Sequence, residues 1–130
     1  MGDESSKTIL VADDESSVRR LIRRLLSKEY KVVEAENGAA AIEIVNKQKV
    51  DLILMDIMMP ETDGLSAAYA IKQNALTSNI PILMVTAINH SLNKKHSENV
   101  IGTNGKKTKP FDNKELLSTI KILLNNRDKP

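Results

Sequence analysis

The chain has 130 residues, enough for one domain with a buried hydrophobic core. It contains no cysteine, which excludes disulfides and thiolate zinc sites, and it has no run of about 18 apolar residues that could cross a membrane. The net charge is only +2, and the aromatic residues are limited to Tyr30, Tyr69 and Phe111. We therefore expect a cytoplasmic protein that neither binds nucleic acid directly nor inserts into a membrane.

The charge is divided unevenly along the chain. Residues 1–87 carry 10 Lys or Arg and 13 Asp or Glu, whereas residues 88–130 carry 9 and 4. The C-terminal part is therefore basic, and we expect a protein partner that binds there to present an acidic surface.

Apolar runs and amphipathic stretches alternate from the N-terminus. Residues 7–12 predict a strand that ends at Asp13-Asp14. Residues 16–27 predict a helix, because apolar side chains recur there at helical spacing. These apolar positions are Val18, Leu21, Ile22, Leu25 and Leu26. We interpret the arginines on the other face, Arg19, Arg20, Arg23 and Arg24, as a solvated surface, the alternative being a partner contact.

The alternation continues through the middle of the chain. Residues 31–35 predict a second strand, Gly38 a break, and the alanine-rich residues 39–46 a second helix. The apolar run inside Asp51-Leu-Ile-Leu-Met-Asp56 is typical of a strand buried on both faces, and it leads into a loop. A third helix is expected from residue 65, fading by Thr77.

The C-terminal part repeats the pattern twice more. Residues 81–86 predict a buried strand with Thr86 at its end, followed by a weak helix at residues 88–100. Residues 105–109 are the poorest strand candidate and end at Lys109. Residues 116–124 then predict an amphipathic helix.

Alternating strands and helices predict an α/β fold, with a doubly wound parallel sheet covered by helices on both faces. In such a sheet, functional side chains gather beyond the carboxyl ends of the strands. Five chemically suitable residues fall at such ends: Asp13, Asp14, Asp56, Thr86 and Lys109. We therefore expect them to converge on one site.

The chemistry of this site follows from its charges. Carboxylates that lie close together repel one another, and a hard divalent cation relieves that repulsion. A few oxygen ligands with room for water favour Mg²⁺. A lysine ammonium and a threonine hydroxyl beside the cation complete a pocket for a phosphoryl group, whose transfer depends on positioning and charge neutralisation. Asp56, at the centre, is the predicted nucleophile.

Four motifs occur in an order and at spacings typical of one family. They are Val11-Ala-Asp13-Asp14-Glu15, Asp51-Leu-Ile-Leu-Met-Asp56-Ile-Met-Met-Pro60-Glu-Thr-Asp63-Gly64, Ile80-Pro-Ile-Leu-Met-Val-Thr86-Ala87 and Thr108-Lys109-Pro110-Phe111. With them, nearly the whole chain resembles the receiver domain of two-component response regulators, of the chemotaxis-receiver type. The resemblance implies a single flavodoxin-like domain over residues 1–130, with a five-stranded sheet in the order 2-1-3-4-5. Residues 1–6 and 127–130 are expected to be flexible ends.

The resemblance also implies a signalling function. Asp56 would accept a phosphoryl group from a sensor histidine kinase or a phosphotransfer protein, and phosphorylation would switch binding to a downstream output protein or domain. The implied Mg²⁺ ligands are Asp13, Asp14, Asp56 and the backbone carbonyl of Met58, and the implied phosphoryl-binding groups are Lys109 and Thr86. The Lys109–Pro110 peptide would be cis. The domain would be no enzyme beyond Mg²⁺-dependent self-phosphorylation and slow self-dephosphorylation.

Two features bear on switching and on phosphoryl lifetime. Receivers usually carry Tyr or Phe three residues before the lysine that corresponds to Lys109, whereas this chain has Lys106 at that position. Either an edge strand simply tolerates this lysine, or the chain is a receiver-like interaction module with atypical or absent phosphorylation-driven switching. Met58 and Ile88 are apolar and are expected to flank the approach of water, which predicts slow hydrolysis of the phosphoaspartate. The alternative is that both side chains simply pack near the site.

Three further questions concern an alternative enzyme class, the kinase docking surface and the extent of the protein. An enzyme of the haloacid dehalogenase class needs an Asp-x-Asp arrangement at the first strand, which Asp13-Asp14 lacks. By resemblance, a kinase would dock on the helix at residues 16–27 and on the loop that follows the strand ending at Lys109. Whether the chain is a stand-alone receiver or an excised domain stays open at this point.

Overall fold

The structure is a computed structural model that describes residues 6–57, 59, 64–87, 106–109 and 113–128. For residues 86–87, 106–109 and 127–128 it describes the backbone alone. The elements in chain order are β1 (Thr8–Ala12), α1 (Ser16–Leu26), β2 (Lys31–Ala35), α2 (Gly38–Lys47), β3 (Leu52–Asp56), α3 (Gly64–Gln73), β4 (Ile82–Ala87), β5 (Lys106–Lys109) and α5 (Asn113–Asp128). The helix expected at residues 88–100 lies outside the described residues.

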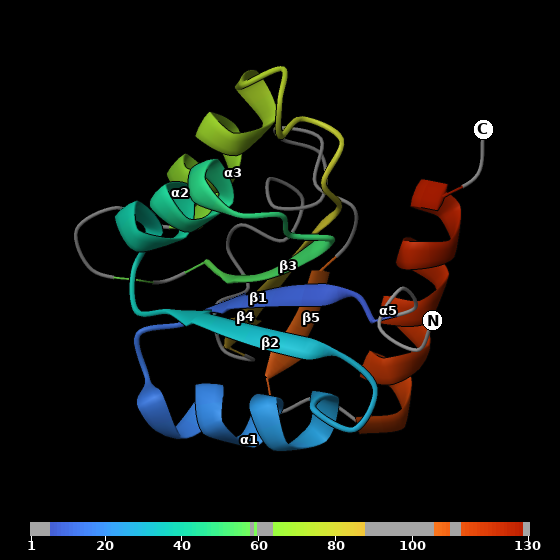
Figure 1. Ribbon diagram of the computed structural model, residues 1–130. Helices are drawn as coiled ribbons and strands as arrows, with labels where there is room; N and C mark the ends of the chain where they lie inside the picture. The colour runs from blue at the N-terminus through green and yellow to red at the C-terminus, as the bar shows by residue number, and fades with distance from the viewer. Residues whose placement is uncertain (1–5, 58, 60–63, 88–105, 110–112, 129–130) are drawn as a thin grey trace.

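The strands form a parallel sheet with helices on both faces, as the alternation predicts. The order β2-β1-β3-β4 agrees with the expected one, and the backbone of β5 pairs with β4 at the edge. Figure 1 shows α1 and α5 on one face of the sheet and α2 and α3 on the other. Because every strand runs in the same direction, all the carboxyl ends meet at one edge.

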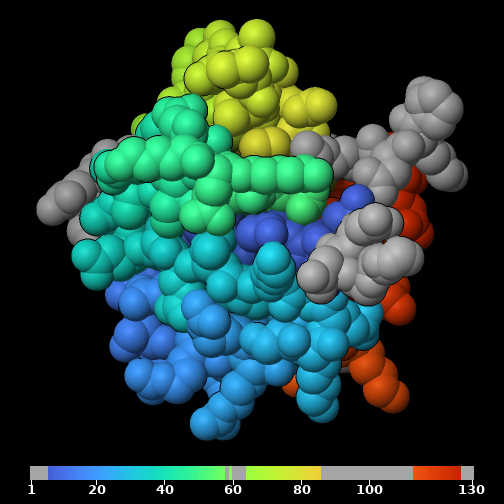
Figure 2. Space-filling view, viewed as in Figure 1, coloured from blue at the N-terminus to red at the C-terminus, as the bar shows by residue number. Residues whose placement is uncertain are grey.

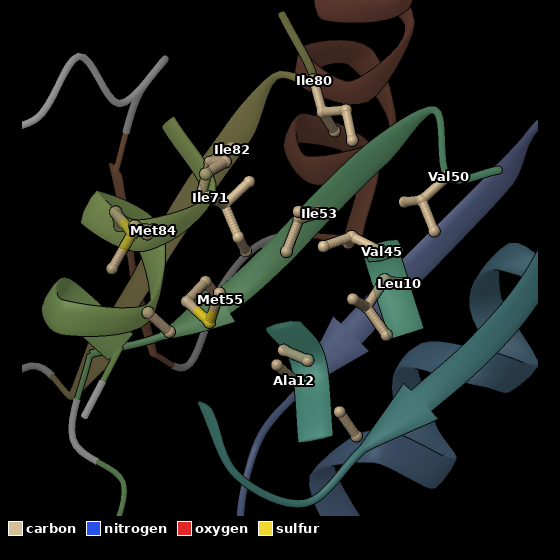
Figure 3. Packing of buried hydrophobic residues seen from close by; sticks show 14 of the residues in the cluster. Leu10, Ala12, Val45, Val50, Ile53, Met55, Ile71, Ile80, Ile82 and Met84 are labelled. Carbon is tan, nitrogen blue, oxygen red and sulfur yellow. The ribbon is translucent and has the colours of Figure 1, made fainter. Parts of the chain in front are cut away.

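Two hydrophobic cores lie on the two faces of the sheet. Successive strand residues point to opposite faces, so Leu10 belongs to the core under α2 and α3, and Val11 to the core under α1 and α5. Figure 3 shows the first of these cores, in which side chains of β1, β3 and β4 meet those of α2 and α3. All five residues of β3 are buried. This two-sided burial explains the unbroken apolar run before Asp56.

Helix α1 departs from the prediction at one apolar position. Ile22 and Leu26 are buried against the sheet, but Leu21 is 64% exposed. The helix rests on the side that carries Ile22 and Leu26, and Leu21 lies at the edge of the apolar stripe, turned towards solvent. Periodicity alone does not show which edge of a wide stripe is left uncovered.

The prediction of a chain break at Gly38 is wrong. Gly38 is the first residue of α2, and the side chain of the preceding Asn37 caps the helix by accepting a hydrogen bond of 2.8 Å from the backbone N–H of Ala40. Asparagine is a favoured N-cap residue, because its side-chain oxygen satisfies a backbone donor that the helix leaves unpaired. The sequence Asn37-Gly38 therefore starts a helix here.

The end of α3 is set by Thr77, in agreement with the expected fading of this helix. The Thr77 side chain is buried, and its hydroxyl donates a hydrogen bond of 2.6 Å to the carbonyl of Ile71. Figure 2 shows the segment after α3 standing out from the body of the molecule. Leu76, in this segment, is 89% exposed. Among the helices of the described ranges, none combines the length and the apolar character needed to cross a membrane.

Candidate functional site

Three acids meet at the carboxyl edge of the sheet. Asp13 follows the last residue of β1, and Asp56 is the last residue of the adjacent β3, where Ala12 pairs with Met55. Oxygen atoms of Asp13, Asp14 and Asp56 all lie within 4.8 Å of one another. The structure therefore brings together three of the predicted site residues.

Two of these acids are buried. The exposed fraction is 2% for Asp13 and 4% for Asp56, whereas Asp14 is exposed to solvent. Buried carboxylates need a compensating positive charge or hydrogen bonds. Three carboxylates, of which one lies on the exposed Asp14, suit a hard divalent cation such as Mg²⁺, which keeps several bound waters. Asp13, Asp14 and Asp56 thus fit a magnesium site.

The main chain and side chain of Asp13 are held on three sides. Its backbone N–H donates to the carbonyl of Ala35 on β2 at 3.0 Å, extending the β1–β2 ladder by one residue. One carboxylate oxygen accepts from the N–H of Glu15 at 2.9 Å. The carbonyl oxygen of Asp13 accepts from the Arg19 guanidinium at 2.5 Å. The loop that carries two of the three acids is therefore tied to β2 and to α1.

The start of α3 packs directly on the end of β3. The N–H of Gly64 donates to the carbonyl of Ile57 at 3.0 Å, and the N–H of Ile57 donates to Val85 on β4 at 2.9 Å. A Cβ atom on Gly64 would lie 1.9 Å from the carbonyl oxygen of Asp56. Only glycine allows this close approach of two backbones, so Gly64 helps to define where Asp56 sits.

The other predicted site residues are described in part or not at all. Thr86 and Lys109 lie in β4 and β5, where Thr86 pairs with Thr108 and Ala87 with Lys109 in parallel register. Their backbones therefore end at the same edge as Asp56, which pairs with Val85. Their side chains, the side chain of Lys106, and the predicted roles of Met58, Ile88 and the Lys109–Pro110 peptide lie outside the described part of the chain.

The interpretation of the α1 arginines as a solvated face is wrong for Arg19, whose side chain is only 15% exposed, whereas Arg23 is exposed as expected but is also engaged in an ion pair. Both donate to Glu34 on β2, with nitrogen–oxygen distances of 2.8 Å from Arg19 and 2.6 Å from Arg23. Hydrogen bonds from Arg23 and then Arg19 hold the pKa of Glu34 below its ordinary value. An isolated acid in an apolar strand, combined with two arginines four residues apart, is the sequence signal that was missed.

The fold and the site together define a class of protein. A parallel α/β sheet with three converging aspartates at its carboxyl edge agrees with the receiver-domain resemblance of the sequence motifs. The family model of the response regulator receiver domain matches residues 9–121. The chain belongs to this family, and so to the proteins of two-component signalling.

Individual relatives agree with this assignment. The phosphate regulon transcriptional regulatory protein PhoB of Pseudomonas aeruginosa is 40% identical over 119 residues, covering 91% of this chain and 52% of that protein. The chemotaxis protein CheY of Halobacterium salinarum is 34% identical over 120 residues, covering 92% of this chain and 98% of that protein. The solved structure of Vibrio cholerae CheY4 has a TM-score of 0.83 and 28% identity, covering 91% of this chain and 98% of that one.

The chain spans about half the length of the curated transcriptional regulators that it matches. By contrast, it spans nearly all of the chemotaxis protein. The family is thus found both as one part of longer regulators and as a protein of about this length.

Proposed function

We propose that this receiver domain accepts a phosphoryl group on Asp56, in a Mg²⁺-dependent reaction, and that phosphorylation switches its binding to an output protein or domain. The observation that carries the proposal is the convergence of Asp13, Asp14 and Asp56 within 4.8 Å at the carboxyl edge of the sheet. Bound Mg²⁺ would be held by these three carboxylates and by the backbone carbonyl of Met58. It would supply the positive charge that balances the acids and the incoming phosphoryl oxygens.

Asp56 is the group that reacts. An oxygen of its carboxylate forms a bond to phosphorus while the phosphorus–nitrogen bond to a donor histidine breaks, and that electron pair returns to the imidazole ring. In transfer from acetyl phosphate, the phosphorus–oxygen bond breaks instead and acetate leaves. The Lys109 ammonium and the Thr86 hydroxyl would bind phosphoryl oxygens and hold the group in line with Asp56. The domain turns over no other substrate, and we expect its phosphoaspartate to hydrolyse slowly.

The phosphodonor would be a cytoplasmic histidine kinase domain or phosphotransfer protein that docks on α1. The outer face of this helix presents an exposed leucine, Leu21, beside two exposed arginines, Arg20 and Arg24. An apolar side chain flanked by cations suits a partner surface that is itself apolar with an acidic rim. The alternative is an interaction module without phosphorylation-driven switching. This alternative rests on Lys106, of which the structure describes only the backbone, and no observation supports it.

The test is the intact mass of the protein after incubation with acetyl phosphate and Mg²⁺. Wild type should gain one phosphoryl group, and Asp56→Asn should gain none. The matched control is Asp51→Asn, just before the first residue of the same strand, because Asp51 is also buried, at 4% exposed, and accepts a hydrogen bond of 2.8 Å from the backbone N–H of Thr8. This variant should be phosphorylated like wild type. Equal phosphorylation of Asp56→Asn, or none of wild type with Mg²⁺, would refute the proposal.

A further inference from the structure

Arg19 connects the acidic site to the side of the sheet that α1 covers. Its Nε donates to one oxygen of Glu34 at 2.8 Å, and its Nη1 donates to the carbonyl oxygen of Asp13 at 2.5 Å. The arginine side chain is only 15% exposed. A guanidinium is a planar fork whose donors point in fixed directions, so the bond to Glu34 orients the group that holds Asp13.

The carbonyl of Asp13 belongs to the peptide plane that joins Asp13 to Asp14. Fixing that plane fixes the direction in which the chain leaves Asp13, and hence where the Asp14 side chain begins. Asp14 needs such support, because it is the exposed member of the cluster and packing does not hold its carboxylate. Asp13, by contrast, is buried and accepts the N–H of Glu15.

We propose that Arg19 is a positioning residue for the metal site: oriented by Glu34, it holds the Asp13–Asp14 peptide so that the Asp14 carboxylate faces Asp13 and Asp56. The inference rests on the proposed function, because it concerns Mg²⁺ binding by those three acids. Groups that hold metal ligands in place from outside the ligand set affect metal affinity strongly, typically by about 10- to 100-fold.

Charge and geometry predict opposite signs for this residue. Arg19 is a cation near a cation site, so by Coulomb's law its removal should strengthen Mg²⁺ binding. If its main role is to hold the Asp13 carbonyl, its removal should weaken Mg²⁺ binding. The sign of the change therefore distinguishes a positioning residue from a merely nearby charge.

Arg23 provides a matched control on the same helix. It donates to the other oxygen of Glu34 at 2.6 Å and to the carbonyl of Val32 at 3.2 Å, outside the acidic cluster. Arg23→Met therefore removes the same charge and a bond to the same acid, while it leaves the bond between Arg19 and Asp13 in place. Arg19→Lys keeps the charge but loses the fork that reaches two acceptors at once.

The experiment is a Mg²⁺ titration of wild type and variants at constant ionic strength, followed by the amide NMR signals of residues 13–15. We expect Arg19→Met to raise the Mg²⁺ dissociation constant about tenfold, Arg19→Lys to raise it in the same direction, and Arg23→Met to change it less than about twofold. In the metal-free proteins, the amide signals of Asp14 and Glu15 should shift in Arg19→Met and stay in place in Arg23→Met. Should Arg19→Met fail to fold, Arg19→Lys, which keeps the charge but loses the fork that reaches both acceptors, should still weaken binding.

The outcomes separate this inference from the proposed function. Unchanged or tighter Mg²⁺ binding by folded Arg19→Met, in a protein whose Asp14→Asn variant loses binding, would overturn the positioning role alone. Equal weakening in Arg19→Met and Arg23→Met would also overturn it, because the effect would then follow the loss of a hydrogen bond to Glu34, which both variants share, and not the bond to Asp13. Absence of Mg²⁺ binding in wild type would overturn the metal site and this inference together.

Discussion

The substitution Gly64→Ala tests the contact between α3 and the phosphoacceptor strand. A Cβ at this position would lie 1.9 Å from the carbonyl oxygen of Asp56 and 2.9 Å from the Cα of Ile57. Real Cβ atoms do not approach other atoms within 3.0 Å, and both neighbours are backbone atoms that cannot rotate away. The end of β3 and the start of α3 would therefore have to separate by about 1 Å.

The expected cost follows from two opposing terms. Overpacking a well-packed interior costs about 1–3 kcal/mol. Alanine is a better helix former than glycine by up to about 1 kcal/mol, and by less at the first position of a helix. We expect a net loss of about 2 kcal/mol in the free energy of unfolding, which lowers Tm by about 6–8 °C for a chain of this size.

The same shift should disturb the site. Asp56 is the residue whose carbonyl is pushed, so its carboxylate would leave the cluster that it forms with Asp13 and Asp14. Mg²⁺ binding and phosphorylation by acetyl phosphate should both fall in Gly64→Ala. The assays are chemical denaturation, Mg²⁺ titration and intact mass.

The control for helix propensity is Ala70→Gly, on the exposed side of the same helix. It should cost about 1 kcal/mol with no effect on Mg²⁺ binding. A Gly64→Ala variant that is as stable as wild type and binds Mg²⁺ equally well would refute the reasoning, because the close approach of the two backbones would then have no consequence.

Three further tests concern core packing, a buried hydrogen bond and an ion pair. Leu26→Ala should lower the free energy of unfolding by about 3 kcal/mol, because Leu26 is fully buried; Leu21→Ala, on the same helix but 64% exposed, should change it by less than about 0.5 kcal/mol in the same denaturation assay. Thr77→Val should cost about 1–2 kcal/mol by thermal or chemical unfolding, because it leaves a buried carbonyl at the end of α3 without its hydroxyl donor. For Glu34, hydrogen bonds from α1 arginines, Arg23 first, lower the pKa in the folded state. Its stabilising contribution is therefore complete above the unfolded pKa of about 4.3 and disappears as the pH falls through the lower folded pKa. Glu34→Gln should accordingly lose less stability than wild type between about pH 5 and about pH 3, and an identical loss in both proteins would contradict this assignment.

Much of the fold could be predicted from local patterns. Side chains that face the core recur with a period of two in strands and of about 3.6 in helices. The spacing of apolar residues in the sequence therefore predicts strands and helices directly. The unbroken apolar run before Asp56 correctly indicated a strand buried on both faces. The patterns failed at Leu21 and at Gly38. The exposure of Leu21 depends on which side of α1 rests on the sheet, and the helical conformation of Gly38 depends on the cap that Asn37 provides.

The candidate site divides in the same way. The parallel direction of the strands, inferred from their alternation with helices, is enough to predict that Asp13, Asp14 and Asp56 share one edge. The oxygen atoms of these acids lie within 4.8 Å of one another because of the register between β1 and β3. This register is a property of the pair of strands, so the sequence of either strand alone does not predict it.

The sequence by itself determined the alternating elements, the acids at the strand ends and the motifs of the receiver family. Only the tertiary structure decided that Arg19 leaves the solvated face of α1 to hold the carbonyl of Asp13, and that Gly64 lies against the carbonyl of Asp56. The physical reason is that both contacts join a backbone carbonyl to a residue on another element. Every residue has the same backbone carbonyl, so the amino-acid sequence does not indicate which carbonyl a side chain or backbone of another element will contact.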